Sequence, residues 1–181
     1  MSHVFDKIDY ESGDGMLTSV WGPPLWHFLH TMSFNYPTNP SEEEKKNYMN
    51  FVKSLENILP CKHCRNNFKK NLQALPLTIK EMESRHTFSK YIFTLHELIN
   101  KMLSKKSNST YENVRETYEH FRARCTEQKI KEIGCVKPLY GEKSKCILRV
   151  IPQTTKAKSF VVDKKCFKRK IKSQTRKNYS T

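Results

Sequence analysis

Apolar residues recur every three or four positions through two long stretches of the chain. The stretch from 41 to 59 carries Tyr48, Phe51, Val52, Leu55, Ile58 and Leu59. The stretch from 84 to 104 carries Phe88, Tyr91, Ile92, Leu95, Leu98, Ile99, Met102 and Leu103. This spacing is typical of helices that bury one face, and only 5 of the 181 residues are glycine. The sequence therefore predicts an all-α fold of ordinary single-domain size.

Proline and turn residues separate further helical segments. A helix is predicted from Trp21, with the prolines of GPPLW in its first turn, and Ser41 is predicted to cap the next helix. Another begins at Cys61 and continues to about residue 73, and a shorter one runs from 111 to about 124. These segments predict a four-helix bundle plus a short fifth helix. No glycine-rich phosphate loop is present, which argues against a dinucleotide-binding parallel sheet.

The positive charge of the chain is concentrated towards its C-terminus. Residues 1–126 contain 17 Lys and Arg against 14 Asp and Glu, whereas residues 127–181 contain 16 against 4. We therefore predict a flexible leader (1–15), a helical domain (16–125) and a mostly irregular basic C-terminal extension (126–181), with strand-like runs at 146–152 and 160–162. Such an extension is either simply solvated or binds an anionic partner without specificity.

The start of the chain, MSHVFDKIDYESGDG, lacks the apolar segment of a secretory signal. No apolar run approaches the roughly 18 residues that a membrane helix needs. These features predict a cytoplasmic protein with no secretory signal and no membrane partner. Six cysteines in such a chain favour catalysis or metal binding over a structural disulfide framework.

The stretch LPCKHCRNNF places Cys61 and Cys64 at a helix start, followed by basic residues. Helix N–H groups and neighbouring cations favour thiolates, and a thiolate beside a second sulfur suits disulfide exchange. Three alternatives stay open. A zinc site needs two more ligands, but Cys125, Cys135 and Cys146 are too widely spaced for a second pair. A thioredoxin-like site needs a preceding strand, and inert buried thiols are the third reading.

Three segments occur in order: WGPPLWHFLHTMSFNYP, LPCKHC and FSKYIFTLHELINKMLSK. Over about residues 18–125 the chain resembles the Erv/ALR family of FAD-linked sulfhydryl oxidases. The resemblance implies a helical bundle that holds FAD in its mouth, and a homodimer. Pro23, Phe93 and Glu97 depart from the common pattern, and Phe93 replaces a cysteine of the family's structural disulfide. These departures are similar to those of members from large DNA viruses.

The resemblance also implies roles for individual residues. Cys61 exchanges with incoming thiols and Cys64 faces the flavin. The residues implied to contact FAD are Gly22, Trp26, His30, Tyr36, His96, Asn100, Lys105, which lies near the phosphates, and Tyr118. No metal is implied.

The implied reaction converts protein dithiols to disulfides and passes the electrons through FAD to O₂, giving H₂O₂. A second cysteine pair, Cys125 with Cys135 or Cys135 with Cys146, is a candidate relay; Cys166 is also available. The alternative function is a helical metal-binding or nucleic-acid-docking module in which the C-x-x-C is structural.

Overall fold

The computed structural model describes residues 4–126, 132–139, 141–152, 154–155 and 161–166. The described residues belong to two compact units. The first lies within 1–111 and 150–152, and the second within 112–149 and 153–181. The predicted domain limits at 15 and 125 stay predictions.

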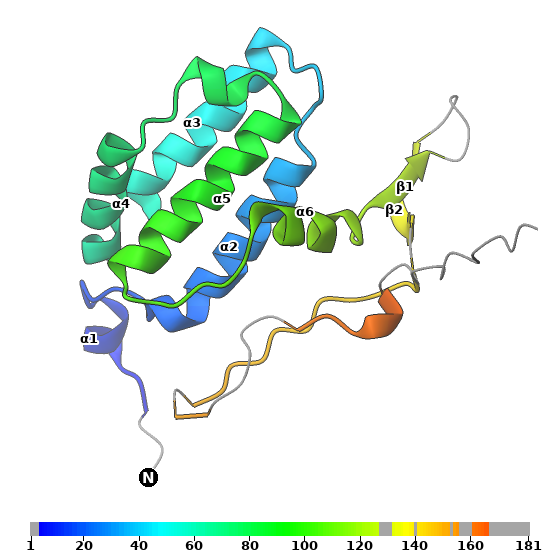
Figure 1. Cartoon of the computed structure of the whole chain (residues 1–181). Coiled ribbons are helices and arrows are strands. Elements are labelled where there is room, and N and C mark those ends of the chain that lie inside the picture. The colour runs from blue at the N-terminus through cyan, green and yellow to red at the C-terminus, as the bar shows by residue number, and fades with distance from the viewer. Residues whose placement is uncertain (1–3, 127–131, 140, 153, 156–160, 167–181) are drawn as a thin grey trace, which may run out of the picture. The chain divides into compact units, whose positions relative to one another are not determined.

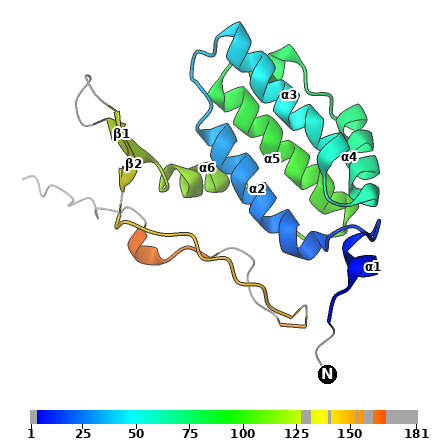
Figure 2. The ribbon, with the colours of Figure 1, turned by 180° about the vertical axis from the view of Figure 1, so that it is seen from behind.

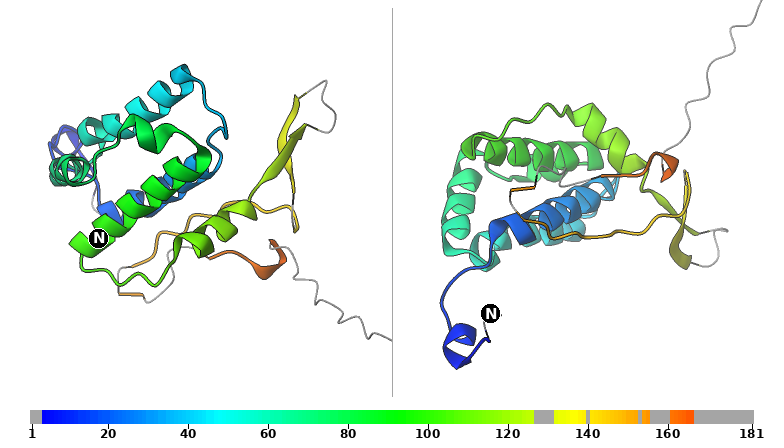
Figure 3. Two further views of the ribbon diagram at one scale, coloured as in Figure 1. Left: turned by 45° about the horizontal axis from the view of Figure 1, so that its top comes forward. Right: turned by 90° about the horizontal axis from the view of Figure 1, so that it is seen from below.

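The first unit is a helical bundle. Its elements are α1 (Lys7–Tyr10), α2 (Thr18–Phe34), α3 (Glu42–Ile58), α4 (Lys62–Ala74), the 3-10 helix η1 (Ile79–Met82) and α5 (Arg85–Met102). Helices α2 and α5 lie alongside each other, and α3 packs on α4 (Figures 1 and 2). In the right view of Figure 3, α4 crosses the direction of α2 and α5. The predicted four-helix bundle is confirmed in α2, α3, α4 and α5.

Side-chain caps explain where the helices begin. The Ser41 hydroxyl accepts from the Glu44 N–H (3.2 Å), and the Glu44 carboxylate accepts from the Ser41 N–H (2.8 Å). Ser41 therefore caps α3 as predicted, and the reciprocal bond from its N–H to Glu44 completes a capping box. Ser84 and Thr87 form the equivalent box at the start of α5.

The start of α2 differs from the prediction. The N–H groups of Val20 and Trp21 both donate to the Leu17 carbonyl, at 2.9 and 3.4 Å, so the helix begins at Thr18. Pro23 and Pro24 therefore lie in the second turn and not in the first. Because a proline has no N–H, each removes one hydrogen bond within the helix.

The core lies between these helices. Its buried apolar residues are Leu29, Tyr36, Val52, Leu55, Leu59, Phe68, Leu77, Met82, Phe88, Tyr91, Ile92 and Leu95. The predicted apolar faces include residues that are not buried. Phe51 is 37% and Ile58 is 63% exposed on α3, and Met102 and Leu103 are exposed at the end of α5. Phe51 instead packs edge-on against Phe28, with ring centroids 6.0 Å apart.

Helix α6 (Tyr111–Glu119) leads into the second unit and ends five residues earlier than predicted. Strands β1 (Ala123–Thr126) and β2 (Glu132–Pro138) follow and pair antiparallel, and η2 (Lys164–Cys166) is a short 3-10 turn. The hairpin was not predicted. The run predicted as strand-like at 146–152 is irregular, as are residues 161 and 162; residue 160 lies outside the described residues.

Across the described residues, the structure contains no helix that is both long and apolar enough to cross a membrane.

Candidate functional site

Cys61 and Cys64 form a disulfide at the start of α4, with their Cα atoms 5.1 Å apart. Cys61 is the N-cap residue in an extended conformation, and its Sγ accepts a hydrogen bond from the Cys64 N–H at 3.2 Å. Both residues are half-buried. The disulfide therefore lies at the positive end of the α4 dipole and within reach of solvent.

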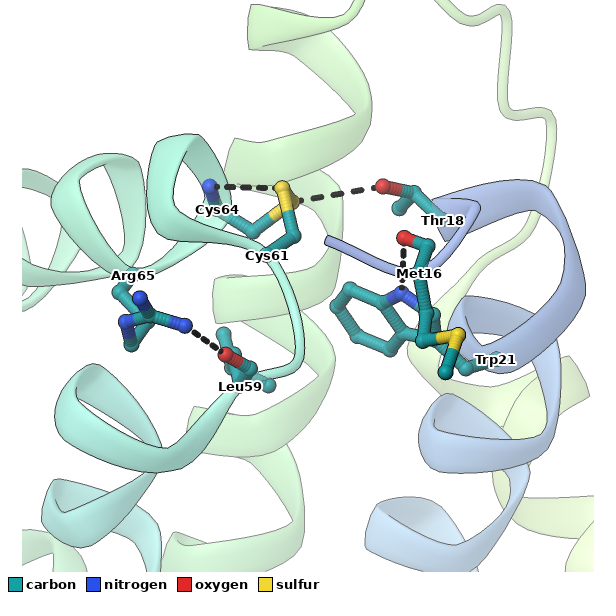
Figure 4. Close-up of a disulfide and its surroundings, with 7 residues drawn as sticks. All are labelled: Met16, Thr18, Trp21, Leu59, Cys61, Cys64 and Arg65. Carbon is teal, nitrogen blue, oxygen red and sulfur yellow. Dashed lines mark hydrogen bonds between the residues drawn. A yellow bond between two sulfur atoms is a disulfide. The ribbon is translucent and has the colours of Figure 1, made fainter. Parts of the chain in front are cut away.

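The segment that precedes α2 packs against this disulfide (Figure 4). The Met16 N–H donates to the Pro60 carbonyl (2.7 Å), and the Trp21 indole N–H donates to the Met16 carbonyl (3.0 Å). This places the Thr18 hydroxyl 3.3 Å from Cys64 Sγ. No motif in the sequence identified Thr18, because the two residues are 46 positions apart.

The bundle also brings together three of the predicted cofactor residues. Nε2 of His30, on α2, lies 3.0 Å from Nδ1 of His96, on α5. The indole of Trp26 is stacked on the His96 imidazole, with centroids 3.9 Å apart and planes 6° apart. The contact between α2 and α5 therefore builds one aromatic–imidazole cluster from residues 66 positions apart.

Both imidazoles in this cluster are neutral at physiological pH. Burial lowers the pKa of His30 to about 3, with further lowering by His96 and His27. Burial also lowers the pKa of His96 to about 4; Glu97 opposes this effect and Lys105 adds to it. In a neutral pair one ring donates and the other accepts, so the cluster can pack against a flat, uncharged ring system.

The end of α5 positions two more predicted residues. Asn100 is half-buried, and its side-chain amide donates to the Glu97 carboxylate at 3.1 Å. The Lys105 N–H donates to the Asn100 carbonyl (2.9 Å), and the Ser104 N–H donates to the Lys101 carbonyl (3.0 Å). These two bonds form a Schellman turn. Lys105 is exposed, and its charge contributes to lowering the His96 pKa.

Two predicted residues of the first motif are buried in the bundle. Tyr36 is fully buried, its hydroxyl donates to the Met82 carbonyl (2.9 Å), and its ring packs on Tyr48 and Phe88. Gly22 is buried on α2, where an added Cβ would lie 3.5 Å from the Thr18 methyl carbon, an ordinary contact. FAD contacts by both residues stay predictions.

Tyr118 belongs to the second unit. Its ring packs edge-on against Phe121, with centroids 5.6 Å apart, and its contact with FAD stays a prediction. Cys125 lies on β1 and Cys135 on β2. Cys146 is an exposed free thiol, so the pairing of Cys135 with Cys146 is not formed here.

The residues described by the structure include no group of three or more His, Cys, Asp or Glu side chains that could hold a metal ion. A zinc site at the C-x-x-C would need both sulfurs as thiolates, whereas here they are bonded to each other.

The fold and site define a class of small helical bundles with a disulfide at a helix start and an aromatic–imidazole cluster in the same bundle. The model of the Erv1/Alr family matches residues 23–128, more than half of the chain. The chain belongs to the Erv1/Alr family, which confirms the resemblance found in its motifs.

Curated relatives include viral and cellular proteins. A probable FAD-linked sulfhydryl oxidase of Acanthamoeba polyphaga mimivirus is 36% identical over 91 residues, which are 50% of this chain and 64% of the relative. An FAD-linked sulfhydryl oxidase of African swine fever virus is 33% identical over 98 residues, 53% of this chain and 80% of the relative. The FAD-linked sulfhydryl oxidase ERV1 of Arabidopsis thaliana is 31% identical over 84 residues, which are 46% of this chain and 42% of the relative. The chain thus spans less than two thirds of the mimivirus and Arabidopsis proteins.

Among solved structures, the core of yeast Erv1 superposes with a TM-score of 0.52 at 23% identity, covering 65% of this chain and 96% of that chain. A mutant of Saccharomyces cerevisiae Erv1 gives the same TM-score at 20% identity, with the same shares covered. This likeness shows that the helical bundle is the Erv1 fold.

Proposed function

We propose that this chain is an FAD-dependent thiol oxidase that converts protein dithiols to disulfides. The observation that carries the proposal is the half-buried Cys61–Cys64 disulfide at the start of α4, in the same bundle as the cluster of Trp26, His30 and His96. The viral relatives, named as FAD-linked sulfhydryl oxidases, support it. We further propose that the enzyme acts as a cytoplasmic homodimer.

The residues present fit FAD. Stacked aromatic rings and neutral imidazoles suit a planar heteroaromatic group. Trp26, His30 and His96 would hold its ring systems, with Asn100 as a hydrogen-bonding neighbour and the exposed Lys105 ammonium suited to phosphate. When bound, FAD supplies a two-electron acceptor that passes electrons from the cysteine pair to O₂, giving H₂O₂.

The chain's own cysteines carry out the exchange with substrate. A substrate thiolate attacks Cys61 Sγ, the Cys61–Cys64 bond breaks, and Cys64 leaves as a thiolate with the electron pair. A second substrate thiol, having lost its proton to solvent, attacks the substrate sulfur of the mixed disulfide and releases the Cys61 thiolate. The substrate leaves as a disulfide, and two electrons are left on the Cys61–Cys64 pair.

Cysteine substitutions test this proposal. Cys64→Ser should abolish oxygen consumption and peroxide formation with dithiothreitol, while the purified protein keeps its flavin. The matched control is Cys146→Ser, because Cys146 is an exposed free thiol, and this variant should turn over like the wild type. Thiol oxidation that persists in Cys64→Ser would contradict the mechanism.

For the relay pair, the hairpin favours Cys125 with Cys135 over the pairing with Cys146. Cys125 and Cys135 belong to two strands that pair antiparallel, with Arg124 opposite Lys137 and Thr126 opposite Glu132 and an irregular register between these pairs. Peptide mapping under non-reducing conditions should recover a cross-linked peptide that contains Cys125 and Cys135. Recovery of both as free thiols in the oxidised enzyme would rule this relay out.

A further inference from the structure

We propose that Thr18 is a catalytic residue, whose hydroxyl stabilises the Cys64 thiolate as the disulfide opens and so favours attack by incoming thiols at Cys61. This inference rests on the proposed thiol oxidase function and assigns a new residue to it. Thr18 is the first residue of α2 and lies outside the C-x-x-C motif.

The hydrogen bond at Cys64 runs from the Thr18 hydroxyl to the sulfur. Thr18 Oγ1 lies 3.3 Å from Cys64 Sγ (Figure 4). A disulfide sulfur carries no hydrogen, so the hydroxyl is the donor. The hydroxyl is directed at the sulfur.

Contacts with the backbone of Pro60 and Cys61 fix the segment that leads into Thr18. The Met16 N–H is bonded to the Pro60 carbonyl at 2.7 Å. A Cβ added at Gly15 would lie 3.0 Å from both the Cys61 Cα and the Pro60 carbonyl oxygen. The chain before α2 therefore lies close against the backbone of the C-x-x-C motif, which positions the hydroxyl.

Each sulfur of the disulfide has its own hydrogen-bond donor. Cys61 Sγ accepts from the Cys64 N–H at the start of α4, whereas Cys64 Sγ accepts from Thr18 at the start of α2. The N-terminus of each helix therefore lies near the disulfide, and helices of 13 residues (α4) and 17 residues (α2) each carry a dipole whose positive end is the N-terminus. When a thiolate attacks Cys61, the negative charge that develops on Cys64 Sγ is stabilised by the Thr18 hydroxyl, which already lies within hydrogen-bond distance.

The step balances without a proton transfer. The incoming thiolate forms a bond to Cys61 Sγ, the Cys61–Cys64 bond breaks, and the negative charge moves to Cys64 Sγ beside the Thr18 hydroxyl. A better-stabilised leaving thiolate leaves faster, so Thr18 favours attack at Cys61 over attack at Cys64. When the second substrate thiol resolves the mixed disulfide, Cys61 is the leaving thiolate, and the Cys64 N–H donates a hydrogen bond to it.

The test compares Thr18→Val with Thr18→Ser in the full chain. Each oxidised protein is mixed with 2-mercaptoethanol without oxygen, quenched with acid and alkylated, and the site of the mixed disulfide is found by peptide mass spectrometry. Thr18→Val should slow opening roughly tenfold, the effect of one hydrogen bond to a charged group, and should lower the fraction of adduct on Cys61. Thr18→Ser and the control Ser19→Ala, exposed at the next position of α2, should stay within about twofold of wild type.

Equal rates and the same site of attack in Thr18→Val and Thr18→Ser would overturn the assignment. If the valine variant fails to fold by circular dichroism, Thr18→Ala compared with Thr18→Ser gives the same test. The measurement follows the disulfide itself and needs no flavin turnover. Failure of the wild type to oxidise dithiothreitol with O₂ would therefore refute the oxidase function separately.

Discussion

The indole ring of Trp26 lies flat on the imidazole ring of His96, with centroids 3.9 Å apart and planes 6° apart. This contact joins α2 to α5 and places two predicted cofactor residues in one cluster with His30. If the cluster holds FAD, removal of the His96 ring should weaken flavin binding more than it weakens the fold.

We therefore predict that His96→Ala weakens flavin binding by at least about tenfold, the equivalent of one lost polar contact and one stacking contact, and so lowers the flavin-to-protein ratio. The ratio is measured from the absorption of the purified protein. The control is Thr94→Ala, an exposed position on the same helix, which should keep full flavin. A fully yellow His96→Ala protein would contradict the proposed pocket.

Stability should fall as the pH is lowered from about 7 to about 5. The folded-state pKa values of His30 and His96, about 3 and about 4, lie below the ordinary value of 6.5. Above pH 6.5 both histidines are neutral in the folded and in the unfolded state, so they do not lower the free energy of unfolding. Below it the unfolded chain binds protons first, so each histidine costs up to about 1.4 kcal/mol per pH unit, for a total of about 2–4 kcal/mol at pH 5.

Urea unfolding at a series of pH values measures this dependence. Glu44 and Glu81 also have lowered pKa values, but they titrate below their ordinary value of 4.5 and so outside this range. His30→Gln should flatten the dependence, whereas the exposed His63→Gln should keep it. The same slope in His30→Gln and wild type would show that His30 is not the source.

Phe93, at the position where the family resemblance implies a disulfide, packs edge-on against Tyr111 at the start of α6, with centroids 5.9 Å apart. The buried Tyr111 hydroxyl also lies 2.9 Å from Ser89 Oγ. We predict that Phe93→Ala lowers the free energy of unfolding by about 2 kcal/mol and Tyr111→Phe by about 1 kcal/mol. The control Thr94→Ala should change the free energy of unfolding by less than about 0.5 kcal/mol. An equally small change in Phe93→Ala would show that the contact between Phe93 and Tyr111 does not stabilise the fold.

Ser104, two residues after the end of α5, has a φ of 53°, in the left-handed region that favours glycine. Ser104→Gly should therefore raise the free energy of unfolding by about 0.5–1 kcal/mol. Ser104→Ala keeps a Cβ and should bring no gain. Thermal and urea unfolding measure both variants, and a destabilised glycine variant would show that the serine side chain stabilises the turn.

The helices of the bundle could be predicted because their signals are local. Ser41 with Glu44 starts α3, and apolar spacing places Val52 and Leu55 in the core. The exposure of Phe51 and Ile58 could not be predicted, because spacing along one helix does not show how far the neighbouring helices cover its buried face. The hairpin escaped prediction because its strands are short and carry charged residues in both β1 and β2.

The site residues that belong to sequence motifs could be predicted. The cysteine pair and the histidine cluster follow from spacing within single helices and from the family resemblance. Thr18 could not be predicted, because its contact with Cys64 depends on how the segment before α2 packs on Pro60. The partner of the basic extension stays a prediction, since the charge pattern alone gives no contact to argue from.

The measurement that tests the account most directly is the visible absorption spectrum of the purified protein, before and after dithiothreitol is added without oxygen. We predict a flavin band that stays with the protein, bleaches with the dithiol and returns in air. In Cys64→Ser the band should be present but should not bleach. A colourless folded protein, or a band that the dithiol leaves unchanged in the wild type, would contradict the claim that the Cys61–Cys64 disulfide passes electrons to FAD.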